Sequence, residues 1–224
     1  MAQEEKYHIF FVLEGDEENM LFDIIKEQGT NPIFDLNFVN AHGFGNIGPY
    51  FQDEIAKEEN DVVLAVYDVD DHKTTAFETV QTQLMDILGT QKRVDAVSIC
   101  TNPNILQIIL LGCDTLNNVT LTSSSKESNT PIVHKYWNDI GKEKVNEKGQ
   151  DSTKLYKANH WQLEEIKGTF LCNETMYCSI LENATALDLD FRNKLPGSNI
   201  LPLLKSLKEG NMEYFKSIQK TCDE

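Results

Sequence analysis

Acidic residues stand at the ends of two apolar segments of this sequence. Glu14 directly follows the run YHIFFVL, residues 7–13. Asp68 and Asp70 directly follow the run DVVLAVY, residues 61–67. Apolar runs of this length without a helical period are typical of strands that are buried on both faces. Because parallel strands bind ligands at their shared carboxyl edge, we expect the three acidic side chains to meet there.

Carboxylate oxygens in this arrangement are hard ligands that suit Mg²⁺ or Mn²⁺. Such a cation contacts phosphate directly, and a second one would clamp the attacking and leaving oxygens of a displacement. Glu14 is then either a further ligand or a general acid or base, and the sequence leaves both roles open. It also leaves the number of cations open. A single Asp-x-Asp motif is common in acidic proteins, so the prediction depends on its combination with Glu14.

Polar residues beside these carboxylates are candidates for substrate contact. His72 and Lys73 are placed to contact a scissile phosphate, although charged residues that open a helix are usually only solvated. Asn102 is placed to orient a phosphate or a metal-bound water. The alternative for Asn102 is an ordinary strand-to-helix turn, because asparagine often precedes proline in such turns.

A second group of candidate substrate-binding residues lies far along the chain. Lys154, Tyr156 and Lys157 are followed by His160 and Trp161, so basic and aromatic side chains alternate. This pattern suits phosphate contact combined with base stacking. The start of an amphipathic helix would give the same pattern, and both interpretations stay open.

Three glycines, Gly43, Gly45 and Gly48, match the spacing of a dinucleotide-binding fingerprint. The motif follows the second expected strand, whereas the fingerprint normally opens the β-α-β unit. We therefore expect a close-packed turn near the acidic residues and not a dinucleotide site.

The segments around these residues alternate between strand and helix patterns. Strands are expected at 7–13, 34–39, 61–67 and 94–100, and helices at 17–28, 47–59 and 75–88, with a further helix opening at Pro103. This alternation predicts an α/β fold with a mostly parallel sheet flanked by helices, Rossmann-like in its layers.

The strand pattern stops after about residue 115. A helix is expected at 131–140, a solvated and mobile connection near 141–152, and helices near 161–181 and 201–221. We therefore expect a catalytic domain at residues 1–115 and a helical carboxy-terminal lobe at residues 116–224.

Composition limits the classes of partner. The formal net charge of −16 argues against tight stand-alone DNA binding, since that affinity normally comes from basic residues that release counterions. Divalent cations at the acidic site would reverse part of this field. No apolar run approaches the roughly 20 residues of a membrane span, and the amino terminus lacks a signal-peptide layout. We expect a cytoplasmic protein with no membrane association, whose five cysteines are reduced.

Two of these segments together resemble a family signature. FVLEGDEE, a strand that ends in Glu-Gly before a helix, is followed one β-α unit later by VYDVDDH. This resembles the TOPRIM (topoisomerase/primase) superfamily. A third segment, Ser98 to Pro103, resembles the Ser-Asn-Pro element of the RloB-like, defence-associated branch. The resemblance covers roughly residues 7–112 and implies a TOPRIM-like sheet, with Gly15 as the turn and Glu14, Asp68 and Asp70 as the metal and acid/base set.

The resemblance implies a Mg²⁺- or Mn²⁺-dependent nuclease that hydrolyses RNA, including tRNA, or DNA. It further implies a toxic antiphage effector and an ATPase partner protein of a defence system. The sequence leaves assembly into a homo-oligomer open. One alternative is an inert TOPRIM-like binding or regulatory module, because Leu106 and Gln107 stand where the family usually has an acidic residue. A second alternative is a haloacid-dehalogenase-like phosphatase with Asp68 as its nucleophile.

Overall fold

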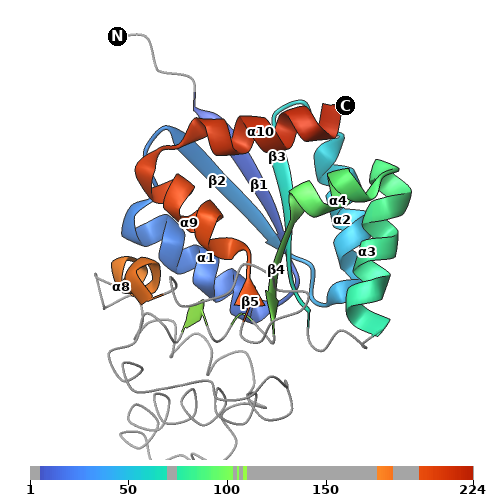
Figure 1. Cartoon of the computed structure of the whole chain (residues 1–224), viewed down its shortest axis with the longest axis horizontal. Coiled ribbons are helices and arrows are strands. Elements are labelled where there is room, and N and C mark those ends of the chain that lie inside the picture. Colours follow the sequence, from blue (N-terminus) through green and yellow to red (C-terminus); the bar gives the residue numbers. More distant parts are fainter. Residues whose placement is uncertain are drawn as a thin grey trace, which may run out of the picture.

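The computed structural model describes residues 6–69, 75–102, 105, 108–109, 176–183 and 197–223. Within them, one five-stranded sheet has the order β2-β1-β3-β4-β5 (Figure 1). The strands are β1 (Tyr7–Leu13), β2 (Phe34–Asn40), β3 (Val62–Asp68), β4 (Ser98–Asn102) and β5 (Gly197–Ser198). The first four are parallel, and β5 is antiparallel to β4. The expected α/β fold with a mostly parallel sheet is confirmed.

The two central strands follow directly from their sequences. The segment Val62–Tyr67 of β3 is apolar at every position and buried at every position. In β1, Phe11, Val12 and Leu13 are completely buried. Strands without an exposed face need helices on both sides of the sheet, which explains why β1 and β3 lie in its middle. Both strands carry their acidic residues out at the same edge.

Helices cover both faces of this sheet (Figure 1). On one face, α1 (Asp16–Gly29) packs on β2, α9 (Ile200–Glu209) packs on β4, and α8 (Met176–Asn183) contacts both helices. On the other face, α2 (Ile47–Ile55) packs against β1, β3 and α3 (Thr75–Leu88). A short 3₁₀ turn, η1 (Phe44–Asn46), leads into α2.

The prediction of one strand is wrong for the first half of the segment. Residues 94–100 were expected to be a strand, but α4 (Gln91–Val97) occupies the first part and β4 begins only at Ser98. Thr90 caps the helix by accepting a hydrogen bond from the Arg93 N–H, and Val94 and Val97 form its buried face. Apolar residues three apart on a short capped helix were thus mistaken for part of a strand.

Two expected helix ends also differ. The helix expected at 47–59 ends at Ile55. The single helix expected at 201–221 is two helices, α9 and α10 (Met212–Asp223), because Gly210 adopts a left-handed conformation with φ 76° and ends α9. Glycine ends helices in this way because it has no Cβ to strain the left-handed backbone. The helices expected at 131–140 and from 161 to 175 lie outside the described residues.

The described carboxy-terminal residues pack on the same sheet as the amino-terminal half. β5 extends the sheet beyond β4. α10 lies along the amino ends of the strands, where Phe215 packs against Tyr7 and Phe34 (Figure 1). The Tyr7 hydroxyl also donates to Gln219 Oε1 at 3.2 Å. Residues 197–223 belong to the helical carboxy-terminal lobe that we expect at 116–224, and they pack on the same sheet. The expected connection near 141–152 lies outside the described residues.

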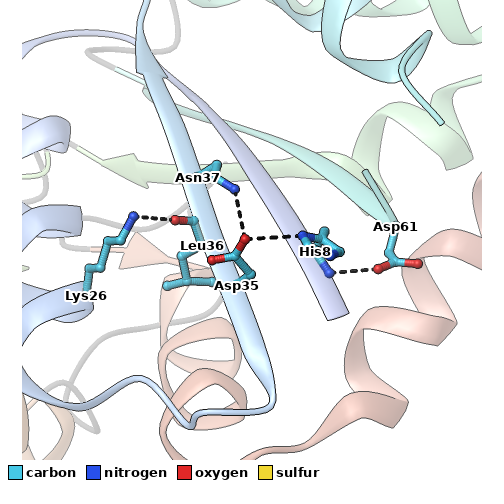
Figure 2. A network of polar contacts seen from close by, with 6 residues as sticks. All are labelled: His8, Lys26, Asp35, Leu36, Asn37 and Asp61. Carbon is cyan, nitrogen blue, oxygen red and sulfur yellow. Dashed lines mark hydrogen bonds and ion pairs between the residues drawn. The ribbon is translucent and has the colours of Figure 1, made fainter. Parts of the chain in front are cut away.

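Figure 2 shows the polar contacts that join the strands at their amino ends. The His8 backbone N–H donates to Asp61 Oδ2 at 2.7 Å, and the Asp61 N–H donates to the His8 carbonyl at 3.0 Å. His8 Nδ1 lies 3.2 Å from Oδ2 of Asp35, its partner in the register of β1 and β2. The His8 and Asp35 side chains are 43% and 40% exposed, so this pair contributes little stability. The network holds β1, β2 and β3 at the edge opposite to Glu14.

None of the helices in the described part of the chain combines the length and the apolar character that crossing a membrane requires.

Candidate metal centre

Glu14 joins the carboxyl end of β1 to that of β3. Its backbone N–H donates to the Val66 carbonyl at 3.0 Å and so continues the ladder between the two strands. Its carboxylate Oε2 accepts a hydrogen bond from the backbone N–H of Asp68 at 3.0 Å. The structure therefore brings Glu14 and Asp68 together at the carboxyl edge of the sheet, where ligands bind in folds of this class.

Asp68 and Asn102 end two neighbouring strands of this edge. Asp68 pairs with Thr101 in the parallel register, so Asn102 stands one residue further along β4. The Oδ1 atoms of Asp68 and Asn102 are buried and accept no hydrogen bond, although both residues have other interactions. Side-chain oxygens of this kind are the ligands that Mg²⁺ takes in proteins. Asn102 is completely buried, which favours an orienting role over direct contact with a phosphate.

Gly15 is the N-cap residue of α1. Its φ of −153° and ψ of −165° are extended, so no left-handed conformation requires a glycine here. A Cβ on Gly15 would lie 3.4 Å from Glu18 Oε2, at the edge of ordinary contact. The Gly15 N–H donates to that Oε2 atom at 2.9 Å. The turn between β1 and α1 is therefore fixed by the Glu18 side chain.

Glu18 is the acidic residue that sequence analysis missed. Its side chain is only 3% exposed, although it carries a carboxyl group. Burial raises the pKa of this carboxyl well above its ordinary value of 4.5, and the nearby negative charges of Glu14 and Glu17 raise it further. The signal in the sequence was a glutamate three residues after the N-cap, a position whose side chain reaches back to the cap. Glu18 adds a second carboxyl group close to Glu14.

The glycine motif forms a turn beside Glu14, as expected. The Gly43 N–H donates to the Glu14 carbonyl at 2.7 Å, and Gly43 has φ 119°, which L side chains rarely adopt. Gly48 lies against α3, where a Cβ would be 2.6 Å from Gln83 Cβ. Two of the three glycines are thus required by backbone conformation or by close packing.

The donor set fits a hard cation in its chemistry. Glu14 and Asp68 supply carboxylate oxygens and Asn102 an amide oxygen, which is the ligand type of Mg²⁺ and Mn²⁺. Within the described ranges, however, no three acidic, histidine or cysteine side chains are close enough to form a metal-binding group. Asp70 lies outside the described residues, as do His72, Lys73, Lys154, Tyr156 and Lys157.

Two cavities lie at the opposite, amino edge of the sheet. One of about 260 Å³ is lined by Asn60, Arg93 and Cys222 among others, and one of about 430 Å³ by Lys6, His8 and Glu58 among others. Neither cavity includes any of the carboxylates at the ends of β1 and β3. The candidate site therefore lies at the carboxyl edge of the sheet, where its side chains could bind a cation, and not in either of these cavities.

Comparison with protein-family models, with curated proteins and with solved structures finds no significant match to this chain.

Proposed function

We propose that this chain is a metal-dependent nuclease of the TOPRIM type that hydrolyses phosphodiester bonds in RNA or DNA. The observation that supports the proposal best is the contact between Glu14 Oε2 and the Asp68 N–H at 3.0 Å. In this contact two acidic residues from non-adjacent segments meet at the edge where a parallel sheet binds ligands. The strand-end acidic residues are thus neighbours in space, which the sequence spacing alone does not require.

Each residue of the site has a defined role in this proposal. Asp68 and, from the sequence, Asp70 hold Mg²⁺ or Mn²⁺, and Glu14 is a further ligand or the group that accepts a proton from the attacking water. The bound cation supplies positive charge for the nucleophile and for the departing oxygen. Asn102, completely buried at the end of the neighbouring strand β4, would help to orient the ligands.

The carboxyl groups repel one another without a cation. Burial raises the pKa of Glu18 most, and the negative charges of Glu14 and Glu17 raise it further. A divalent cation beside Glu14 would relieve the repulsion and reverse the local field. The arrangement therefore favours cation binding over a merely solvated acidic surface.

The biological setting of the proposal rests on the resemblance of the acidic motifs to RloB-like proteins. We propose an antiphage effector that acts together with an ATPase partner protein. The net charge of −16 supports a need for a partner or an activation step, because tight binding of nucleic acid normally comes from basic residues that neutralise phosphates.

A second candidate function is an inert TOPRIM-like binding or regulatory module. Two observations favour it: the described residues contain no group of three metal-ligating side chains, and Leu106 and Gln107 replace the acidic residue expected after Asn102-Pro103. Such a module would bind a cation or nucleic acid without cleaving it.

The test is a cleavage assay on tRNA, single-stranded DNA and plasmid, with Mg²⁺, Mn²⁺ or a chelator. Glu14→Gln and Asp68→Asn remove charge from the site, and Asp61→Asn removes a charge at the opposite end of β3 as a matched control. We expect metal-dependent cutting by the wild type and by Asp61→Asn, and a loss of at least about 100-fold in the two site variants.

Calorimetric titration with Mn²⁺ separates the two candidate functions. Cation binding that needs Glu14 and Asp68, without any cutting, would identify the inert module. A wild type that neither binds Mn²⁺ nor cuts any substrate would reject the proposed metal centre.

A further inference from the structure

The loop of residues 41–46 crosses the end of β1 on its way from β2 to α2. The Ala41 N–H donates to the Leu13 carbonyl at 2.8 Å, and the Gly43 N–H donates to the Glu14 carbonyl at 2.7 Å. α2, which follows the loop, packs against β1 and β3. The loop backbone therefore forms a wall directly beside Glu14.

Side chains from three elements hold this loop in one conformation. Asn46 Nδ2 donates to the Ala41 carbonyl at 2.8 Å and closes the loop on itself. Gln83 of α3 donates to the Gly45 carbonyl at 3.0 Å. Asn40 donates to Asp16 at 2.6 Å and accepts from the His42 N–H at 2.8 Å. The loop is thus fixed to both the Glu14 turn and the helix layer.

The backbone of this loop is also strained. His42 has φ 54°, and it is the one non-glycine residue with a positive φ among those the structure describes. Gly43 follows with φ 119°. Non-glycine residues persist in this region when the surrounding contacts impose it, and such positions cluster at functional sites. Phe44 follows Gly43 directly in this loop.

Phe44 is 39% exposed at the tip of this held loop. The other large apolar residues with comparable exposure in the described part of the chain are Tyr50 and Ile55, both on α2. Ile55 lines the cavity at the amino edge, away from the carboxylates. Phe44 is thus an exposed aromatic residue on a loop whose backbone contacts Glu14.

The negative net charge of the chain bears on how Phe44 could contact a nucleic acid. With a net charge of −16, this chain gains less affinity for a nucleic acid from neutralised phosphates than a basic protein does. Stacking of a base on an aromatic ring does not depend on charge, and every base offers a flat face. Bases inside a duplex do not offer that face, whereas unpaired bases do.

We infer that Phe44 is a specificity-determining residue that stacks on an unpaired base next to the scissile phosphate. This inference rests on the proposed nuclease function and narrows its substrate to single-stranded or looped nucleic acid. The loop 41–46 positions the ring, and Glu14 and Asp68 act on the adjoining phosphodiester.

Binding of a fluorescent single-stranded oligonucleotide, measured with Ca²⁺ in place of Mg²⁺, tests the inference. Phe44→Ala is compared with Phe44→Trp, which keeps an aromatic face, and with Ile55→Ala, which removes an equally exposed side chain elsewhere. We expect Phe44→Ala to weaken binding about tenfold, and Phe44→Trp and Ile55→Ala to bind like the wild type. Circular dichroism checks that each variant is folded.

An oligonucleotide of the same length with abasic sites separates stacking from backbone contact. The wild type should bind it about tenfold more weakly than the intact strand, and Phe44→Ala should bind the two equally. In the cleavage assay, Phe44→Ala should raise KM and leave kcat unchanged. Equal binding of the intact strand by the wild type and Phe44→Ala would overturn the inference.

The outcomes also distinguish this inference from the proposed function. Cleavage that needs Glu14 but is unaffected by Phe44→Ala leaves the nuclease standing and rejects the stacking role. Base-dependent binding through Phe44 without any cleavage supports the stacking role and rejects the nuclease. A wild type that neither binds nor cuts rejects both.

Discussion

Glu14 Oε2 accepts a hydrogen bond from the backbone N–H of Asp68 at 3.0 Å, so a side chain of one strand end is bound to the main chain of another. The position of the Glu14 carboxylate is therefore set by the backbone at Asp68 and not by the Asp68 side chain. Asp68→Asn should leave Glu14 in place, which makes this substitution a clean test of charge at the site.

Glu14→Ala should destabilise the chain by about 1–2 kcal/mol, because the Asp68 N–H loses a charged acceptor in a partly buried position. Glu14→Gln keeps an oxygen acceptor and should cost clearly less. Urea unfolding in the presence of a chelator measures both. Equal stability of the two variants would show that the contact contributes nothing to folding.

Glu18 should make the stability of the chain depend on pH. Burial first, and then Glu14 and Glu17, raise the pKa of Glu18 in the folded chain well above 4.5. In the unfolded chain the carboxyl ionises near its ordinary pKa, so above about pH 4.5 the unfolded state releases a proton that the folded state keeps. The contribution of Glu18 to stability is therefore fully present below that pH and is lost as pH rises through the folded pKa.

Glu18→Gln removes this titration and retains an oxygen that accepts from the Gly15 N–H. The variant should match the wild type near pH 4.5 and become the more stable of the two as pH approaches neutrality. Urea unfolding at a series of pH values, without divalent cations, checks this. A constant difference across the series would mean that Glu18 titrates alike in both states.

Central strand β1 and helix α3 were predictable from the sequence because residue patterns within each segment determine them. β1 was expected at 7–13 and forms at Tyr7–Leu13, and α3 was expected at 75–88 and forms at Thr75–Leu88. Uninterrupted apolar runs and a helical period decide these elements before any tertiary contact. The boundary between α4 and β4 was not predictable in this way, because Val94, Val97 and Ile99 are apolar in both elements and only the Thr90 cap separates them.

Only the part of the candidate site that follows from the parallel strand topology was predictable from the sequence. Parallel strands bring Glu14 and Asp68 to one edge, and the structure has them there. Glu18 was missed because acidic residues in the first turn of a helix are explained by the helix dipole alone. Glu18 is buried because α1 packs on the sheet, and this packing cannot be inferred from the residues next to Glu18 in the sequence. Asp70 lies outside the described residues and stays a prediction.

Gly48→Ala should destabilise the chain by roughly 1–3 kcal/mol, because the new Cβ would lie 2.6 Å from Gln83 Cβ and would force α2 away from α3. Gly45→Ala is the matched control: its Cβ meets nothing within 4 Å and Gly45 has no positive φ. That variant should stay within about 0.5 kcal/mol of the wild type. Thermal unfolding of both variants decides whether close packing explains Gly48.

The Asn199 side chain contributes to the docking of the carboxy-terminal segment on β4, beside the pairing of β5 with β4. Asn199 Oδ1 accepts from the Cys100 N–H at 2.7 Å, and its Nδ2 donates to the Ser98 carbonyl at 2.8 Å. The amide of Asn199 thus pairs with the strand as a further peptide group would. Both of its hydrogen bonds are needed to satisfy the edge of β4 in a partly buried position.

Asn199→Ala should therefore destabilise the chain by about 2 kcal/mol, since it leaves the Cys100 N–H and the Ser98 carbonyl without these partners. Asn199→Asp keeps the acceptor but turns a carboxylate oxygen toward the Ser98 carbonyl, so it should also destabilise at neutral pH and recover when the carboxyl is protonated. Asn37→Ala, at an exposed position on β2 whose side chain makes only a 3.4 Å contact, is the control and should have little effect. Urea unfolding of the three variants at neutral and acidic pH, each compared with the wild type at the same pH, measures these differences. If Asn199→Ala unfolds like Asn37→Ala, α9 and β5 are held on the sheet by their other contacts, such as the β4–β5 ladder and the hydrogen bond from the Ser198 hydroxyl to the Cys100 carbonyl.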